Sequence, residues 1–160
     1  MCKSVHKICL RLLAAVILVL AASSCGDSIR NIQITSVQLE SYKITSSSTM
    51  EATFLVEVSN PAKDLKISDL SAVLKYDGEA ILNATAPDVE LEGASTAEYR
   101  LPCEASLAEN VSLLKAGMLL ANLDTDKLKA DLSLGITPQG GHLKKLNFKD
   151  LDIASLLKQE

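Results

Sequence analysis

The feature that most constrains the fold of this chain is a strict alternation of side chains between residues 97 and 105. Apolar side chains stand at Ala97, Tyr99, Leu101, Cys103 and Ala105, with Glu98, Arg100, Pro102 and Glu104 between them. Because successive side chains of a β-strand point to opposite faces, this pattern predicts a strand with one face in a core. Cys103 then lies on the core face as an inert thiol. Pro102 cannot donate to a ladder of hydrogen bonds, so its outward position indicates a sheet edge or a gap in the pairing.

Similar alternation along the rest of the chain predicts a mainly β fold. Further strands are expected at 32–45 with a bulge near Thr35, at 52–59, 65–76, 79–85, 89–91 and 127–136, and at 143–153 with a bulge or a short helical turn after it. The dipeptide Asp77-Gly78 is a strong signal for a two-residue hairpin turn. Short strands with regular turn signals predict one antiparallel β-sandwich of about seven strands.

One segment has helical periodicity instead. Ser106 and Glu109 have the spacing of a capping box, and apolar residues recur at Leu107, Val111, Leu114 and Met118, as far as about Asn122. We predict one inserted helix that packs its apolar face on the sheet of its own domain. The alternative is a face that contacts lipid or a partner, although Lys115 supplies the only basic charge of the segment, which disfavours a membrane surface.

The N-terminal segment has the three regions of an export signal. Lys3, Lys7 and Arg11 form a basic head, residues 12–20 are apolar, and four small residues lead into Cys25. The apolar run is shorter than the roughly 20 residues of a membrane-spanning helix. The arrangement resembles the lipobox of bacterial lipoproteins, in which the cysteine is acylated and the peptide before it is removed.

This resemblance implies a division of the chain. Residues 1–24 would be a removed signal peptide, residues 25–31 a lipidated cysteine with a short tether, and residues 32–160 a single domain. Two acyl chains hold a protein stably at a membrane, whereas one holds it only marginally. We therefore expect a protein of the bacterial cell envelope whose partner is the membrane, bound through acyl chains on Cys25.

The N-terminal segment leaves some questions open. An ordinary secretory signal cleaved elsewhere is the alternative, because Ala22 stands where the commonest lipobox has Leu. The outer membrane is favoured over the inner one, although Asp27 resembles the inner-membrane retention signal of enteric bacteria. The face of the membrane stays open. The tripeptide Asp27-Ser28-Ile29 resembles a short O-glycosylation signal, with Ser28 as the acceptor.

The charge and cysteine content limit the partners of the remaining 136 residues. Their net charge is −7, because the removed segment holds three of the 16 Lys and Arg and none of the 20 Asp and Glu. A surface of this sign disfavours nucleic acid. Cys2 and Cys9 leave with the signal and lipid consumes Cys25, so Cys103 is alone and no intrachain disulfide is expected.

Residues 25–160 lack the usual constellations of catalytic chemistry. His142 is the only histidine there, and it follows two glycines without a cysteine pair to complete a metal site. The acidic pairs Asp124/Asp126 and Asp150/Asp152 lack the glycine and the distal glutamate of a calcium loop. No nucleophile motif and no glycine-rich phosphate loop is present. We therefore predict no catalytic residue, no metal and no cofactor.

The segment from Ala52 to Pro61, an alternating strand that ends in Asn60-Pro61, resembles the late-embryogenesis-abundant group-2 family, also called the water-stress and hypersensitive-response domain. The strands at 65–76 and 97–105 and the helix fall where that family places them, although Ala62 stands where the family often has Asn. The resemblance implies an immunoglobulin-like or fibronectin-like sandwich and a non-catalytic protective role. Asn60 and Pro61 are interpreted as fold markers, since Pro ends a ladder and Asn bonds a turn through its side chain.

One functional hypothesis and two alternatives follow. The first is a membrane-anchored, non-catalytic envelope lipoprotein that acts in protein interaction or in protection against stress and desiccation. The first alternative is a carrier of lipid or another apolar ligand between the two sheets. The second is a structural subunit of a surface appendage that pairs through an exposed edge strand.

Overall fold

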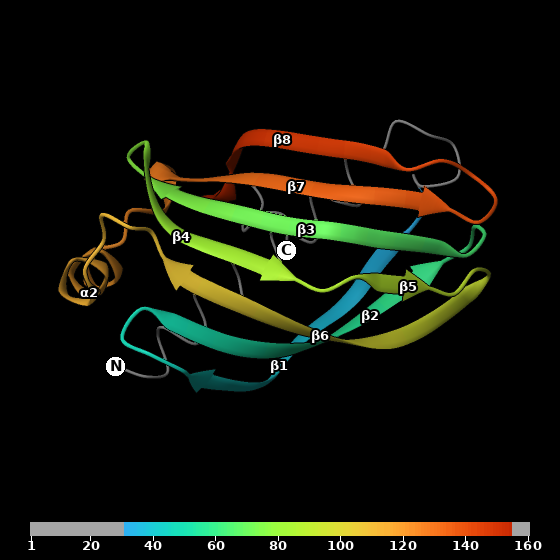
Figure 1. Ribbon diagram of the computed structural model, residues 1–160, viewed down its shortest axis with the longest axis horizontal. Helices are drawn as coiled ribbons and strands as arrows, with labels where there is room; N and C mark the ends of the chain where they lie inside the picture. The colour runs from blue at the N-terminus through green and yellow to red at the C-terminus, as the bar shows by residue number, and fades with distance from the viewer. Residues whose placement is uncertain (1–30, 155–160) are drawn as a thin grey trace.

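The predicted antiparallel β-sandwich with one inserted helix is confirmed (Figure 1). The computed structural model describes residues 31–154, and the export signal and Cys25 lie outside this range. The strands are β1 (Gln33–Ile44), β2 (Thr49–Asn60), β3 (Leu65–Tyr76), β4 (Glu79–Ala86), β5 (Val89–Leu91), β6 (Ser95–Leu107), β7 (Leu128–Pro138) and β8 (Lys144–Asp152). The helix α2 spans Leu113–Ala121, and a 3₁₀ turn, η1, spans Thr125–Lys127.

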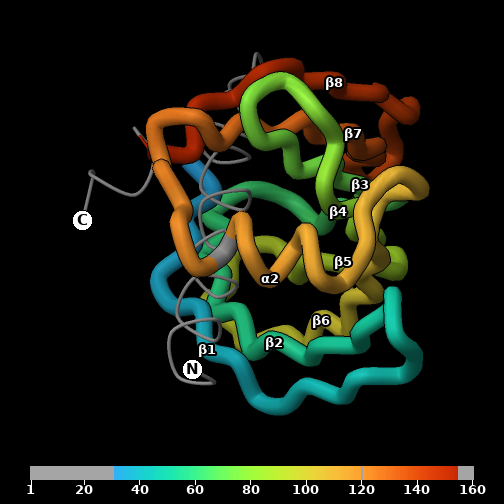
Figure 2. Tube along the Cα trace, turned by 90° about the vertical axis from the view of Figure 1, so that its left-hand side faces the viewer, coloured from blue at the N-terminus to red at the C-terminus, as the bar shows by residue number. Residues whose placement is uncertain are grey.

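The strands form one continuous antiparallel sheet that folds over into two layers (Figure 2). Its order is β1-β2-β6-β4-β3-β7-β8, and β5 pairs with one end of β3. The layer of β1, β2 and β6 is joined to the other layer by a short pairing of residues 82–85 in β4 with residues 104–107 in β6. On the opposite side β1 and β8 end the sheet without pairing with each other. The sandwich is therefore closed by hydrogen bonds on one side only.

The main core lies between the two layers and is made by the alternating faces of the strands. Its buried members come chiefly from β2, β6 and β7: Ala52, Phe54, Val56, Val58, Leu65, Leu91, Leu101, Cys103, Leu132, Leu134 and Ile136. A smaller cluster of Leu128, Ala130 and Ile153 lies at the end of the sandwich near α2. Both clusters lie within residues 31–154.

The local features predicted around β6 are present. The pairing of β4 with β6 begins only at Glu104, so Pro102 lies beside a gap in the ladder. Cys103 is buried at 7% exposure, and burial raises the pKa of its thiol to about 11. This residue is therefore a core thiol, as the alternation indicated.

The predicted turn and bulges are also confirmed. Asp77 and Gly78 both have positive φ, at 54° and 83°, which is the geometry of a type I′ hairpin turn. The register of β1 shifts between Ile34 and Ser36, where the bulge was expected. The register of β7 with β8 shifts as well, beside Asp150, whose φ is 53°.

The predicted start of the helix at Ser106 is wrong. Ser106 and Leu107 belong to β6, where Ser106 pairs with both Thr49 and Asn83. Pairing on two sides outweighs the local capping-box signal. The helix begins at Leu113, and its cap lies six residues after Ser106: the side chain of Ser112 accepts the N–H of Lys115 at 3.2 Å.

The predicted packing of the helix on the sheet is wrong as well. Leu113, Leu114 and Met118 are 64%, 75% and 62% exposed. Within the helix Ala116 and Leu119 are partly buried, whereas Val111 before it is buried and Leu123 after it packs against the smaller core cluster. The side of α2 that carries Leu114 and Met118 therefore faces solvent. No helix within residues 31–154 is both long and apolar enough to cross a bilayer.

Candidate functional site

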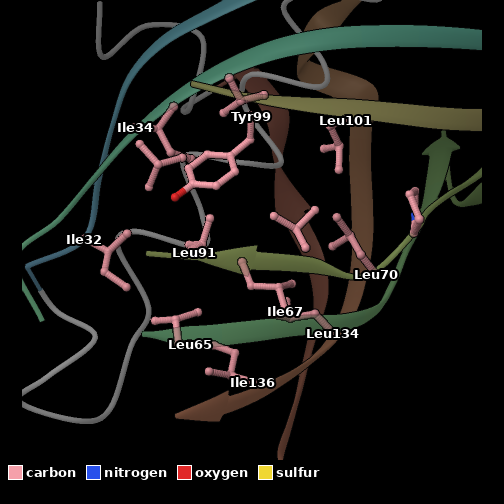
Figure 3. Close-up of a pocket in the computed structure, with 14 residues that line it drawn as sticks. Ile32, Ile34, Leu65, Ile67, Leu70, Leu91, Tyr99, Leu101, Leu134 and Ile136 are labelled. Carbon is pink, nitrogen blue, oxygen red and sulfur yellow. The ribbon is translucent and has the colours of Figure 1, made fainter. Parts of the chain in front are cut away.

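An apolar cavity lies between the two layers, at the end of the sandwich where β1 begins (Figure 3). Its volume is about 90 Å³, and it is partly open to the surface. The lining comes from both layers: Ile32, Ile34, Val56, Val58, Leu65, Ile67, Leu70, Pro87, Val89, Leu91, Tyr99, Leu101, Leu134 and Ile136. The labelled side chains in Figure 3 point into this shared space.

The strand pattern explains where the cavity forms. Near it, β4 has already ended at Ala86, and the three-residue β5 replaces it beside β3. The described pairing of β4 with β6 does not extend past Thr85, so no strand bridges the two layers over this part of the sandwich. The inward side chains therefore meet without filling all the space between them.

Tyr99 carries the one polar side chain of the described lining. Its hydroxyl accepts a hydrogen bond from the backbone N–H of Glu92 at 2.9 Å. This bond holds the ring over the loop that follows β5. The oxygen accepts this bond, and the phenol O–H can still donate one. Because all the other lining side chains are aliphatic, the interior favours an apolar guest over a charged one.

The predicted fold marker Asn60 lies beside the cavity without lining it. Its side chain is buried at 1% exposure. The amide nitrogen donates to the carbonyls of Lys63 and Glu92, each at 3.1 Å, and Oδ1 accepts the N–H of Ala62 at 3.1 Å. The bond to the turn was expected from the sequence, and the bond to Glu92 adds a link to the loop after β5.

Further bonds hold the same two loops together. The backbone N–H of Ala94 donates to the carbonyl of Ala62 at 2.8 Å, and the N–H of Gly93 donates to the carboxylate of Asp64 at 2.6 Å. A Cβ at Gly93 would lie 2.6 Å from backbone atoms of residues 62–64. The approach therefore requires glycine, and it fixes Leu65 and Leu91, which line the cavity. Pro61 is exposed and follows the last residue of β2.

Cys25, the predicted lipidation site, lies outside the described residues. The described chain nevertheless enters the domain at the cavity, because Ile32 lines it. Of the residues singled out from the sequence, Asn60 is linked to the cavity end, because it bonds the carbonyl of Glu92, whose N–H bonds Tyr99. The lining residues were missed as a site, since alternation shows which side chains face inward but not where they leave space.

An ion pair lies on the outer face near the cavity. Lys66 of β3 and Asp88 before β5 are 2.7 Å apart, and both side chains are about half exposed. The hydrogen bond between them raises the pKa of Lys66 and lowers the pKa of Asp88. The pair therefore stays charged at neutral pH and faces solvent rather than the cavity.

The other polar residues weighed from the sequence do not converge on a reactive site. His142 is exposed in the β7–β8 loop. Asp124 caps η1 by accepting the N–H of Asp126, whereas Asp150 pairs with Lys75 at 2.8 Å and Asp152 with Lys129 at 3.6 Å. Within residues 31–154 no group of three or more His, Cys, Asp or Glu is arranged to hold a metal ion.

No protein-family model and no curated protein matches this chain. Among solved structures, it is similar to a crystal structure of a protein from Archaeoglobus fulgidus, with 15% identity, a TM-score of 0.46 and coverage of 73% of this chain and 97% of the other. It is also similar to a beta-glucuronidase from glycoside hydrolase family 2, with 10% identity, a TM-score of 0.35 and coverage of 74% of this chain and 12% of the other. Both TM-scores are below 0.5, so neither structure indicates a function for this chain.

Proposed function

We propose that this protein is a lipid-anchored, non-catalytic binding protein of the bacterial cell envelope, and that its ligand is a single aliphatic chain. The observation that carries the proposal is the composition of the cavity lining, in which Tyr99 is the one polar side chain and its hydroxyl is already bonded. Such a lining offers apolar contact and no charge to bind a polar headgroup. It therefore suits the end of a hydrocarbon chain.

The size of the cavity limits what the observed state can hold. Its volume of about 90 Å³ is below the roughly 300–1,000 Å³ of small-molecule sites. An engineered apolar cavity of about 150 Å³ admits benzene. The observed state therefore has room for the tip of a chain, and a longer chain needs the layers to separate where β1 and β8 are unpaired.

The position of Ile32 connects this site to the proposed anchor. Six residues, 26–31, stand between Cys25 and Ile32, and they span at most roughly 20 Å when extended. An acylated Cys25 would thus keep the cavity end of the sandwich close to the bilayer. This arrangement supports a role in which the domain takes an aliphatic chain from the membrane surface or shields one near it.

The ligand is tested on the full chain purified from bacterial envelopes. Mild native mass spectrometry followed by solvent extraction should find one aliphatic molecule per protein, in addition to any lipid bound covalently to Cys25. An empty protein that also fails to take up palmitic acid would contradict the ligand proposal.

The anchor is tested separately by membrane fractionation of a Cys25→Ala variant. We expect the variant to leave the membrane fraction, because the acyl chains are the proposed attachment. A variant that stays in the membrane fraction would contradict the anchor and leave the ligand result unaffected.

Protein interaction is the second candidate function, and the exposed helix α2 favours it. Leu113, Leu114 and Met118 make the largest apolar exposure on that helix. In the stress-protection form of this proposal, the interaction would matter during drying or osmotic shock. A deletion strain with unchanged survival of both treatments would contradict that form.

A further inference from the structure

The apolar side of α2 is unusual for a soluble domain. Leu113, Leu114 and Met118 lie within two turns of one helix and are each more than 60% exposed. The half-buried side chain of Ala116 lies between them in sequence and faces the domain. Single exposed apolar side chains are common on protein surfaces, whereas several large ones together on one element often mark an interaction surface.

This surface has room for a close approach. Gly117 stands beside Met118, and nothing lies within 4 Å of the position a Cβ would take there. We name the set Leu113, Leu114 and Met118 the distal apolar surface.

The charges around the distal apolar surface are mainly acidic. The hairpin at residues 77–79 and the segment 109–127, which contains α2, together hold five acidic residues and two lysines. These are Asp77, Glu79, Glu109, Asp124 and Asp126, with Lys115 and Lys127. Lys115, the one charge within α2, is neutralised by Glu79 at 3.1 Å. A partner with basic residues around an apolar centre would complement this arrangement.

We propose that the distal apolar surface binds a helical segment of a partner protein, with an apolar stripe flanked by Lys or Arg. Apolar side chains at helical spacing recognise an amphipathic helix through such contacts. An anionic bilayer would be repelled by the acidic flank. A second copy would bring like charges together, which disfavours self-association.

The place of α2 in the fold agrees with a protein partner (Figure 1). The 12 residues of β1 separate Ile32 from this end by roughly 40 Å at about 3.3 Å per residue. With the anchor proposed above, α2 faces away from the bilayer. This orientation depends on the proposed anchor, whereas the binding of a partner helix to the distal apolar surface does not.

The test uses residues 26–160, which contain every described strand and both core clusters. Two synthetic helical peptides with the same leucine stripe, one flanked by Lys and one by Glu, are titrated while the methyl NMR signals of the distal apolar surface are followed. We expect saturable 1:1 binding of the Lys-flanked peptide, with at least tenfold weaker binding of the Glu-flanked peptide. Leu114→Glu and Met118→Glu should each weaken the first complex at least tenfold, while Glu109→Lys should weaken it less.

The matched control is Leu143→Glu, which changes a 49% exposed leucine at the opposite end of the sandwich and should leave binding unchanged. The melting temperatures of all variants should agree within a few degrees, since exposed positions carry little of the stability. Equal binding of both peptides, binding of neither, adsorption to phosphatidylglycerol vesicles in place of the peptide, or concentration-dependent dimerisation would each overturn the proposal. Because no cavity ligand or lipid anchor is involved, these outcomes are independent of the proposed ligand and anchor. They bear on the second candidate function, protein interaction through α2, which this inference deepens.

Discussion

The side-chain amide of Asn60 donates to the carbonyl of Glu92 at 3.1 Å, across 32 positions of the chain. The same side chain bonds Ala62 and Lys63 in its own turn. One buried amide therefore joins the end of β2 to the loop after β5. Since these loops hold Leu65 and Leu91, this contact fixes the cavity end of the sandwich.

Replacing Asn60 by alanine should lower the free energy of unfolding by about 2 to 3 kcal/mol, because buried backbone groups lose their partners. Urea unfolding of residues 26–160 measures the change. Asn83→Ala is the control, since Asn83 is exposed on β4, and its effect should stay within about 0.5 kcal/mol. Equal effects of the two substitutions would contradict the role given to Asn60.

Two glycines should respond in opposite directions to alanine. Gly93→Ala places a Cβ 2.6 Å from backbone atoms of the neighbouring loop, so we expect a loss of at least about 1 to 3 kcal/mol. Gly117→Ala meets open space inside α2 and should stabilise the protein by about 0.5 to 1 kcal/mol. Thermal unfolding measures both, and a neutral Gly93→Ala would show that the two loops can separate at little cost.

Asp131 should contribute to the pH dependence of stability. The hydrogen bond from Lys75, at 2.8 Å, lowers its pKa below the ordinary value of 3.8. The stabilisation is therefore present above that value and is lost as the pH falls through the lower pKa of the folded state. Asp131→Asn keeps an oxygen to accept the N–H of Asp150 and removes only the charge. Its unfolding free energy should lie below that of the unaltered chain at pH 6, and the difference should shrink below about pH 4.

The more exposed pair provides the control for this experiment. The pKa of Asp88 is also lowered by its lysine, but both partners of that pair are about half exposed. Asp88→Asn should therefore change the pH profile less than Asp131→Asn. The reverse order would contradict the assignment of the pH dependence to the Lys75 network.

Cys103 should be unreactive in the folded state. Burial raises the pKa of its thiol from 9.0 to about 11, so the nucleophilic thiolate is scarce at pH 8. Iodoacetamide should modify Cys103 in residues 26–160 only when the chain unfolds, and rapid modification of the folded protein would contradict the burial.

The same thiol should affect stability at high pH. The unfolded chain loses the thiol proton at a lower pH than the folded chain, so the free energy of unfolding should fall as the pH rises from about 9 towards 11. Cys103→Ala should remove this part of the pH dependence.

The strands were predictable because their local pattern and their pairing agree. β2 and β6 pair without a shift from Thr49 with Ser106 to Asn60 with Ser95, and their burial alternates from Ala52 to Asn60 and from Ser95 to Ala105. The hairpin at Asp77 was equally clear, because two positive φ angles in a row suit few residue pairs. In these elements a local rule and a tertiary contact demand the same conformation.

The helix was not predictable in the same way. Ser106 carries a local capping signal, but its pairing with β2 and β4 keeps it in a strand. The apolar spacing of Leu114 and Met118 correctly indicated a helix, yet periodicity does not show whether an apolar face meets the core of its own domain or solvent. The cavity could not be predicted for a related reason. The alternation shows that Val58 and Ile67 face the interior, but it does not show how tightly the interior is packed around them.

The central claim is that the space between the layers binds an aliphatic chain, and palmitic acid binding to a cavity-filling variant tests it most directly. Val89→Phe puts a larger side chain into the lining, whereas Val37→Phe enlarges a core-facing residue of β1 outside the lining. Displacement of a fluorescent fatty acid from residues 26–160 should show 1:1 binding to the unaltered sequence and to Val37→Phe, with at least tenfold weaker binding to Val89→Phe. No saturable binding to the unaltered sequence, or equal binding to the two variants, would contradict the claim.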